Sequence, residues 1–463
     1  MIEIDIHFFD CLNNRSDVSF YNDRFISLIN DIKSIPHKPL YKLAHFSSEN
    51  WNQRDFFEDF FPYIEISSID VQDGSIREIS NIEKLKAPSR AKKIIRNNDI
   101  LISTTRPNRG AISIFRDMES IKIASTGFAV IRKISDEIIR EYLYIMLRQG
   151  SSLLQMEQRS SGGNYPAITE DELKKILIPL PPITVQQQIV DLYNAAIEEK
   201  QAKELEAKEL LAGVDDYLIK ELGIELTENV LNERYFEVCI LDLIGERLDT
   251  FYNNPIYSGI DEKISIGKYS FKKIKEICYA VSGVVYSSSD ESEKGKAILR
   301  GNNITLETNE INYDSIRYIR DSFIIPNSQK LQKDDILMSS ASGSKEHVGK
   351  VAYVEDDMDY YFGGFMTVLR RREKNYNQKY LFAFLQSKLF RSYLYRNLGG
   401  TNINNLSFNM LANLKIPFPP IEKQNEIAAH IQSIRTKAIL LKAEAINVLE
   451  KAKREVEGIV TMR

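Results

Sequence analysis

One segment of the sequence has the residues of a phosphate-binding loop. Residues 343–350 (Gly-Ser-Lys-Glu-His-Val-Gly-Lys) end in the Gly-Lys pair with which a P-loop holds nucleotide phosphates. A P-loop has four residues between its two glycines, whereas this segment has five. Val351 also occupies the position at which a Ser or Thr would bind magnesium. We therefore reject a nucleotide site here.

Two other segments suggest enzymes that act on DNA. Residues 254–257 (Asn-Pro-Ile-Tyr) approach the Asn-Pro-Pro-Tyr catalytic turn of adenine-N6 methyltransferases, but the second Pro is missing and no Gly-rich turn for S-adenosylmethionine precedes it. Residues 290–294 (Asp-Glu-Ser-Glu-Lys) suggest a nuclease metal site, but they lie in a Ser-rich stretch without a second carboxylate on a strand. The five His and the three Cys (Cys11, Cys239 and Cys278) have no metal-ligand spacing, so we expect no metal. The sequence indicates a binding protein and no catalytic residue.

A basic segment contains the residue types best suited to DNA. Residues 84–109 carry eight Lys or Arg (84, 86, 90, 92, 93, 96, 106 and 109) against Asp99 alone, as phosphate neutralisation would need. The loop at 103–110 adds Arg, Asn and hydroxyl side chains, which can hydrogen-bond to base edges. The candidates from this segment are Arg90, Lys92, Lys93, Ser103, Thr104, Thr105, Arg106, Asn108 and Arg109. The alternative is a solvated polar loop.

The sequence repeats itself. Seven of twelve positions are identical between residues 178–189 and 416–427, at an offset of 238. Three more pairs of segments match in the same order: 15–21 with 247–252, 99–103 with 335–339, and 162–164 with 400–402. Four ordered matches indicate a tandem duplication of a unit of roughly 230 residues.

The second repeat has a polar loop at the place of the first. Residues 339–350 correspond to the 103–110 loop, and both repeats follow it with a Gly-rich stretch. The further candidates are Asn164 and Tyr165 in the first repeat, and Ser340, Ser342, Ser344, Lys345, His347, Lys350, Arg371, Asn402 and Asn404 in the second. Equivalent loops with different side chains favour two DNA-binding units with different base preferences.

Composition limits the class of protein. The 463 residues carry 61 Lys+Arg against 65 Asp+Glu, a net charge of -4, so overall charge does not indicate nucleic acid. With 43% hydrophobic and 27% charged residues the chain is expected to be folded, and its length suggests two to four domains. Neither a membrane-spanning run nor a secretory signal is evident, and three widely spaced Cys fit a reducing compartment. We expect a cytoplasmic protein that does not bind membranes.

Each repeat is expected to have a mixed α/β part and a long helix. Strand patterns occur at 100–105, 351–354 and 366–369, and helix patterns at 141–147 and 380–385. A Pro-Pro pair opens each long helix, because proline suits the first helical turn. The expected organisation is a first domain at 1–182, a helix at 183–222, a second domain at 223–420 and a helix at 421–463.

The second long helix has a heptad pattern. Its apolar residues step by four and three: Ile427, Ile431, Ile434, Ala438, Leu441, Ala445, Val448 and Ala452. The first long helix has a similar series, interrupted by Lys200 and Lys203: Ile189, Tyr193, Ala196, Ala207, Leu210, Val214 and Tyr217. Sustained heptads indicate a partner helix, and we expect the two helices to pair with each other. A helix of 40 residues would be ~60 Å long, more than a small domain is wide.

These features together resemble the specificity (S) subunit of type I restriction–modification systems. The resemblance rests on the order of a mixed domain, an Ile-Pro-(Leu/Phe)-Pro-Pro-Ile segment opening a long helix, and then both again. Supporting segments are the Asp-Ile-Leu-(Ile/Met)-Ser strands at 99–103 and 335–339, the Gly-rich loops at 162–164 and 399–402, and residues 247–255. The resemblance covers essentially the whole chain.

The resemblance implies two tandem target recognition domains of α/β (α+β) fold, each followed by a long helix, with the helices forming an antiparallel coiled coil that acts as a ruler. It implies a bipartite site on double-stranded DNA. The partners would be two methyltransferase (M) subunits and motor-nuclease (R) subunits, which would carry S-adenosylmethionine, ATP and magnesium, while this chain would bind no cofactor. The family's base-contacting residues vary with the target, so the candidates above rest on loop chemistry.

Two other interpretations stay open. The chain could be the DNA-binding subunit of a system in which nuclease and methyltransferase are one polypeptide. It could also be a scaffold, with two domains on a coiled-coil strut and no role in DNA binding. The basic segment 84–109 favours the DNA-binding interpretations.

Overall fold

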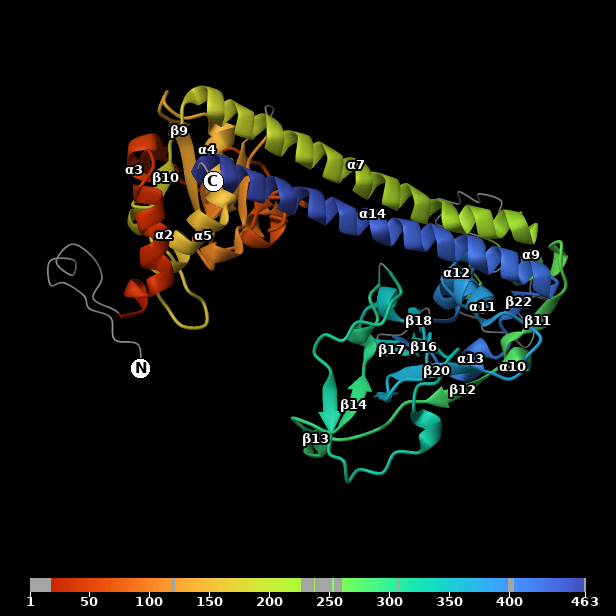
Figure 1. Ribbon diagram of the computed structural model, residues 1–463. Coiled ribbons are helices and arrows are strands. Elements are labelled where there is room, and N and C mark those ends of the chain that lie inside the picture. The colour runs from red at the N-terminus through yellow and green to blue at the C-terminus, as the bar shows by residue number, and fades with distance from the viewer. Residues whose placement is uncertain are drawn as a thin grey trace. The chain divides into compact units, whose positions relative to one another are not determined.

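The computed structural model describes residues 18–117, 121–225, 237, 252–253, 260–306, 308–398 and 404–461. Cys11, Cys239, the rejected turn at 254–257 and most of the repeat segment at 247–252 lie outside the described residues. The chain forms two compact units, Met1–Glu204 with Ala443–Arg463, and Leu205–Lys442. Each unit therefore combines one mixed α/β part with segments of both long helices (Figure 1).

The first unit contains two four-stranded sheets, with the orders β2-β9-β6-β7 and β4-β3-β8-β5, and a ribbon in which β1 pairs with β10. The strands are His37–Pro39 (β1), Ala44–Phe46 (β2), Phe60–Ile64 (β3), Ser80–Glu83 (β4), Ala91–Ile95 (β5), Ile100–Ser103 (β6), Ile112–Ile114 (β7), Lys122–Ser125 (β8), Phe128–Ile134 (β9) and Leu177–Pro179 (β10). The α-helices are Asp23–Lys33 (α2), Leu40–Leu43 (α3), Arg140–Arg148 (α4), Gly150–Arg159 (α5), Glu170–Leu173 (α6) and Ile183–Leu222 (α7), which continues into the second unit.

The second unit repeats this topology except in its second sheet, where β13 is added beside β15, whereas in the first unit β5 is added beside β8. Its sheets have the orders β12-β20-β16-β18 and β13-β15-β14-β19, β11 pairs with β22, and β17 pairs with β21. The strands are Phe271–Lys273 (β11), Cys278–Ser282 (β12), Glu291–Ser292 (β13), Lys296–Leu299 (β14), Arg317–Ile319 (β15), Ile336–Ser339 (β16), Ala341–Ser342 (β17), Val351–Tyr353 (β18), Tyr360–Phe362 (β19), Met366–Arg371 (β20), Asn404–Asn405 (β21) and Lys415–Pro417 (β22). The α-helices are Ile260–Ile266 (α9), Ile274–Ile277 (α10), Gln378–Phe384 (α11), Lys388–Leu398 (α12), Phe408–Leu411 (α13) and Ile421–Thr461 (α14).

The duplication predicted from the sequence is confirmed by this topology. In each unit the first sheet is antiparallel, and the second contains one parallel pair, β3 with β8 or β14 with β19. The strands expected near 100, 351 and 366 and the helices expected near 141 and 380 are present as β6, β18, β20, α4 and α11.

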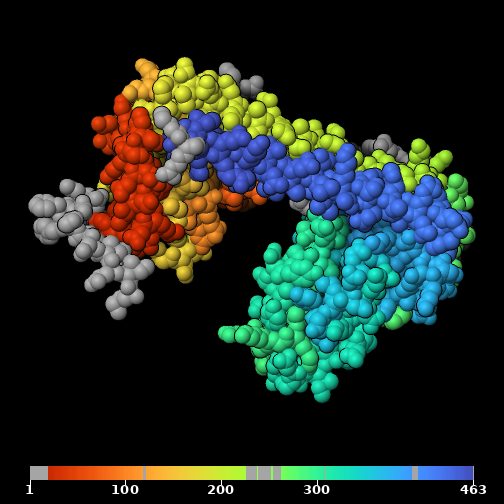
Figure 2. Space-filling model, viewed as in Figure 1, coloured from red at the N-terminus to blue at the C-terminus, as the bar shows by residue number. Residues whose placement is uncertain are grey.

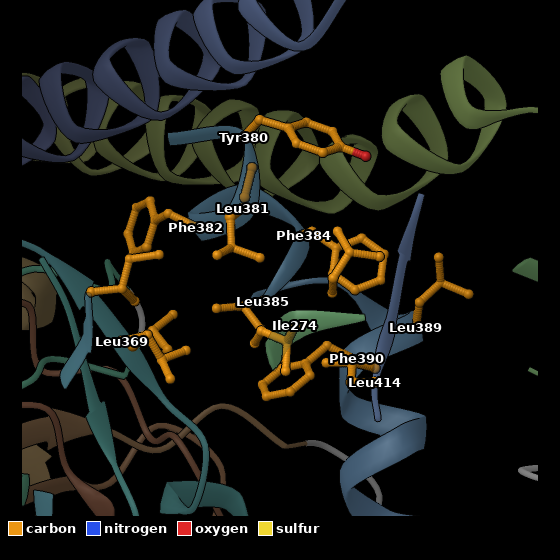
Figure 3. Packing of buried hydrophobic residues seen from close by; sticks show 14 of the residues in the cluster. Ile274, Leu369, Tyr380, Leu381, Phe382, Phe384, Leu385, Leu389, Phe390 and Leu414 are labelled. Atoms are coloured by element: carbon orange, nitrogen blue, oxygen red, sulfur yellow. The ribbon is translucent and has the colours of Figure 1, made fainter. Parts of the chain in front are cut away.

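The central strands explain the packing of both units. All four residues of β6 and of β16 are buried, because these apolar strands are covered on both faces. Ile336 packs with the helix side, whereas Leu337 packs with the second sheet. Figure 3 shows the helix side of the second unit, where Phe384, Leu385 and Phe390 from α11, its C-cap and α12 meet residues of α10 and of the segment before β22.

The two long helices pair in an antiparallel manner. Within the second unit, Glu206 of α7 pairs with Lys437 of α14, and Glu221 pairs with Lys423. Later residues of α7 thus pair with earlier residues of α14. Ala207, Ala438 and Leu441 form a small buried cluster between the helices. Within the first unit, Lys203 of α7 lies 2.8 Å from Glu444 of α14. In each unit the two helical segments lie side by side (Figure 1 and Figure 2).

The heptad prediction is correct for most of the seam and wrong at two positions of α14. Six of the eight predicted positions of α14 are buried, but Ile434 and Val448 are only half-buried, and Leu449 is buried beside Val448. Lys200, expected to interrupt the α7 seam, is 3% exposed, and its ammonium lies 2.7 Å from Asp73 and 2.9 Å from Glu204. A paired lysine therefore replaces an apolar residue there. No helix of the described chain has the length and apolar composition to cross a bilayer.

Candidate nucleic-acid interface

Two loops predicted to bind DNA in the first unit lie against each other. The backbone of Thr105 forms an isolated bridge with Ala167. The Thr104 carbonyl accepts a 2.9 Å hydrogen bond from Ile168 N, and the Arg106 N–H donates to the Pro166 carbonyl at 2.7 Å. The polar loop after β6 and the Gly-rich loop before α6 are thus joined by backbone hydrogen bonds.

Arg106 is held by both of these loops. Its backbone has the left-handed values φ 47 and ψ 52, which a non-glycine residue adopts only when neighbours fix it. Its guanidinium donates to the Asn164 carbonyl at 2.8 Å and lies 4.3 Å from the ring centroid of Tyr165. Tyr165 is 70% exposed. The pair therefore presents an arginine with remaining donors and a flat ring to the solvent.

Basic side chains of β5 lie near these loops. The Arg90 carbonyl accepts a 2.8 Å hydrogen bond from Thr126 N. Gly127, which follows Thr126, accepts a 2.8 Å hydrogen bond from Thr104 N, so Arg90 is linked to the loop after β6. Arg90 and Lys92 are exposed, Lys93 is half-buried, and Asn108 and Arg109 are exposed after the loop turns. Within the described part of the chain the side chains of Arg90, Lys92, Lys93 and Arg109 have no hydrogen-bond or ion-pair partner, so their charges remain for phosphates.

The rest of the basic segment and two hydroxyls make internal contacts. Lys84 donates to the Phe57 carbonyl, Lys86 pairs with Glu83, and Arg96 lies 3.0 Å from Glu49. The Ser103 hydroxyl is buried and donates to the Thr105 carbonyl, while the Thr104 hydroxyl donates to the Gly127 carbonyl. The hydroxyls of Ser103 and Thr104 therefore support the loop from within.

The second unit joins its equivalent loops in the same way. Strand β17 pairs with β21, which places Ser342 opposite Asn404. Ser344 and Lys345 are exposed, and Ser342 and His347 are half-buried. Asn402 lies outside the described residues, and only the backbone of Asn404 is described. The proposed contacts of this unit are therefore drawn from residues 342–347.

Three candidates of the second unit have internal partners. Ser340 is 6% exposed. The Lys350 ammonium is buried and donates to the Ile304 carbonyl at 2.7 Å, and burial lowers its pKa. The Arg371 guanidinium donates to the carbonyls of Glu373 and Tyr376 at 2.8 and 2.5 Å. The side chains of Lys350 and Arg371 therefore stabilise loops, and the buried Ser340 side chain is not presented to a ligand.

Asp290, from the segment that suggested a nuclease site, and Cys278 are both engaged in the interior of the second unit. Asp290 accepts hydrogen bonds from the Ser287 hydroxyl at 2.7 Å and from Arg320 at 2.8 Å, so its carboxylate closes a turn. Burial raises the pKa of the Cys278 thiol to about 11, which makes it a poor nucleophile. Among the described residues no group of three His, Cys, Asp or Glu side chains is placed to hold a metal ion.

Two exposed apolar residues were missed by the sequence reasoning. Phe365 is 76% exposed in a turn bonded to Ser340 and Ala341, and Val285 is 83% exposed on a loop that packs against this turn. Apolar residues in a sequence are expected to be buried, so composition alone gives no signal for them. Within the sequence, Phe365 is distinguished by the repeat, because it corresponds to Gly127 of the first repeat at the offset of 238.

A family model for the type I restriction modification DNA specificity domain matches residues 29–207 and again residues 267–451. The chain belongs to this family. Over 416 residues it is 23% identical to the type I restriction enzyme MjaVIII specificity subunit of Methanocaldococcus jannaschii, a match that covers 87% of this chain and 85% of the relative. Over 150 residues it is 30% identical to the HindI specificity subunit of Haemophilus influenzae, covering 31% and 32% of the two chains.

A solved structure shares the fold of this specificity-domain chain. It is described as showing the structural basis of complex assembly and conformational transition of the type I R-M system. The two chains are 21% identical with a TM-score of 0.50, and the match covers 92% of this chain and 96% of the other. The resemblance inferred from the sequence motifs is thereby confirmed at the level of family and fold.

Proposed function

We propose that this protein is the DNA-specificity subunit of a type I restriction–modification complex, and that each unit reads one half of a bipartite site on double-stranded DNA. The observation that carries the proposal is the duplicated loop pair. In both units a polar loop after the central strand pairs with the residues that follow the Gly-rich run, Ala167 or Asn404–Asn405, while the side chains on the loops differ. Two scaffolds of one fold with different polar side chains suit two different half-sites.

The partners of the complex follow from the same proposal. Two methyltransferase (M) subunits would supply S-adenosylmethionine and catalysis, and motor-nuclease (R) subunits would supply ATP-driven translocation with magnesium. Because the chain has a net charge of -4, its own DNA affinity is expected to be weak. Binding should become much tighter and salt-sensitive once the partners complete the phosphate contacts. A related system with nuclease and methyltransferase in one polypeptide would change the partners and not this role.

Selection from random-sequence DNA tests the proposal. The chain is co-purified with the methyltransferase subunit encoded beside it, and bound DNA is sequenced. Two short motifs at a fixed gap are expected, and exchange of residues 1–182 with those of a relative should change only one motif. An intact complex that selects no motif would instead favour the scaffold interpretation.

Charge reversal identifies the surface. Arg106→Glu with Arg109→Glu should abolish DNA retention by the complex, because it replaces two cations of the first unit by anions. Lys33→Glu with Lys42→Glu is the matched control, since both lysines are exposed on α2 and α3 and the net charge changes equally. Equal DNA retention by the two double variants would contradict the proposed interface.

A further inference from the structure

An exposed aromatic ring stands beside the candidate DNA-binding loop of the second unit. Phe365 lies in the turn between β19 and β20, and its side chain is 76% exposed. Its carbonyl accepts hydrogen bonds from Ser340 N at 2.9 Å and Ala341 N at 3.3 Å. The ring is therefore carried on backbone that is bound directly to the loop after β16.

The first unit has no side chain at this position. Gly127 occupies the equivalent turn between β8 and β9, and its carbonyl accepts from Thr104 N at 2.8 Å. A Cβ on Gly127 would lie only 2.8 Å from a side-chain carbon of Ile66. The duplicated framework thus presents a phenyl ring in one unit and bare backbone in the other.

A second apolar side chain comes from the adjoining loop. Val285 is 83% exposed, and its Cγ2 lies 3.2 Å from the position that a Cβ would take on Gly364. The two loops are fastened together, since Val284 N donates to the Phe362 carbonyl at 2.7 Å. A Cβ on Gly283 would be 2.0 Å from the Gly363 carbonyl oxygen, so the backbones pack too closely to admit one. Phe365 and Val285 are therefore exposed apolar side chains on two loops that are bound to each other, and we call this pair the apolar ridge.

Such a ridge is unfavourable in water and is better explained by a partner that covers it. The Phe365 turn is bonded to Ala341, the residue before Ser342, and so to the loop proposed to contact DNA in this unit. DNA-binding proteins insert Phe and aliphatic side chains between neighbouring base pairs, which partly unstacks and kinks the duplex. Pyrimidine–purine steps yield most easily.

We propose that Phe365, with Val285 beside it, is a wedge that the second unit inserts between two base pairs of its half-site. This inference rests on the proposed function and adds how the second half-site is read. The second unit would favour a deformable TA or CA/TG step, whereas the first unit reads through Arg106 and its neighbours. The two half-sites would then differ in the kind of readout as well as in sequence.

The test uses the complete complex with its methyltransferase partner and the DNA site obtained by selection. 2-Aminopurine replaces each adenine of the second half-site in turn, because every flexible step contains adenine and the probe brightens when it is unstacked. The wild-type complex should raise the fluorescence several-fold at one step, in addition to the position of the base that the methyltransferase itself flips out of the stack. Phe365→Ala should remove this signal and weaken binding about tenfold, whereas Phe365→Leu, which keeps an apolar wedge, should retain much of both.

Ile324→Ala is the matched control. Ile324 is 90% exposed in the same unit but lies elsewhere on it. The residue before it, Phe323, is bonded to Lys296 at the start of β14, whereas the turn that carries Phe365 is bonded to Leu299 at the end of that strand. This variant should keep the fluorescence signal and the affinity. An unchanged signal in Phe365→Ala would overturn the wedge.

Two further outcomes separate the alternatives. In the first outcome, Phe365 causes no adenine to unstack, and replacing a thymine by deoxyuridine weakens wild-type binding as much as Phe365→Ala does. The ring would then contact a thymine methyl group, and the wedge would be wrong. If the complex selects no motif at all, the proposed DNA-reading function fails, and the wedge fails with it. Loss of the wedge alone leaves the selected motifs in place.

Discussion

A buried ion pair explains why one short motif occurs twice. Asp99 and Asp335 precede the central strands β6 and β16, and each is 1% exposed. Asp335 accepts hydrogen bonds from Arg370 at 2.8 and 2.7 Å and from Gln332 N at 2.9 Å. Asp99 receives the equivalent contacts from Arg132 and the Arg96 N–H. The Asp-Ile-Leu repeat therefore marks the framework and not the DNA-contacting residues.

Removing one member of this pair should destabilise the second unit. Asp335→Asn leaves the buried Arg370 charge without its partner, which costs about 3 kcal/mol. Hydrogen exchange of the β16 amides in the full chain should then be about 100-fold faster. The double variant Asp335→Asn with Arg370→Met should recover part of this loss, because no charge stays buried. A double variant as unstable as the sum of its two single variants would show that the ions do not act as a pair.

The candidate DNA-binding residues were only partly predictable at this scale. Polar residue types selected the loops of Arg106, Tyr165 and Ser342, and the structure joins these loops in pairs by backbone hydrogen bonds. The same rule could not separate exposed from buried polar groups, so Lys350 was included although it bonds to a carbonyl in the interior. It also passed over Phe365, since exposure of an apolar side chain depends on contacts distant in sequence.

At the scale of elements, one glutamine anchors each long helix to its unit. Gln186 and Gln424 belong to the repeated Pro-Pro segment, and both are fully buried. The Gln424 side chain accepts from Asn377 N at 2.9 Å and donates to the Pro419 carbonyl at 2.8 Å. Gln186 makes the equivalent contacts with Ile139 N and the Pro181 carbonyl. The helix start is thereby fixed to the turn that precedes α4 or α11.

Gln424→Ala should loosen α14 where it begins. The variant leaves the partly buried Asn377 N–H and the buried Pro419 carbonyl without their partners, which costs about 2 kcal/mol. Hydrogen exchange of the first turns of α14 and of α11 should therefore accelerate about 30-fold, while exchange in the first unit stays unchanged. Gln432→Ala is the control, because Gln432 lies exposed on the same helix. Equal effects of the two substitutions would show that the buried contacts contribute nothing.

The buried Lys200 makes the stability of the first unit depend on pH. Burial opposes the negative charge of Asp73, but the hydrogen bonds from Lys200 and Ser75 outweigh this effect and lower the pKa of Asp73 below its ordinary 3.8. The stabilisation by Asp73 is therefore present above that pH and is lost as the pH falls through the folded-state pKa. Lys200→Met should cost about 3 kcal/mol at pH 7, and its difference from wild type should shrink below about pH 4.

Fluorescence during urea unfolding can measure this, because Trp51 is the single tryptophan and is buried in the first unit. Lys33→Met, at an exposed position of α2, should follow the wild type at every pH. A difference between Lys200→Met and wild type that stays constant from pH 7 to pH 3.5 would rule out the contribution of Asp73.

At the scale of the whole molecule, the duplication was predictable because identical residues recur in the sequence at nearly constant offsets. The sheet order was not, since strand pairing joins segments far apart in sequence: β3 pairs with β8, and β14 with β19. The sequence also did not reveal that the compact units divide within the long helices, at residues 204–205 and 442–443. Heptad periodicity predicts that the two helices pair, but it does not predict which part of each helix packs into which unit.

A matched insertion in both helices tests the proposed role of the helix pair as a ruler. Seven residues added after Glu206 of α7 and seven after Lys437 of α14 preserve the heptad face and lengthen the pair by about 10.5 Å. At 3.4 Å per base pair, the gap between the two selected motifs should grow by about three base pairs, with both motifs unchanged. An insertion in α7 alone should put the helices out of register and abolish selection. Recovery of the original gap from the doubly lengthened protein would show that the helices do not set the distance between the half-sites.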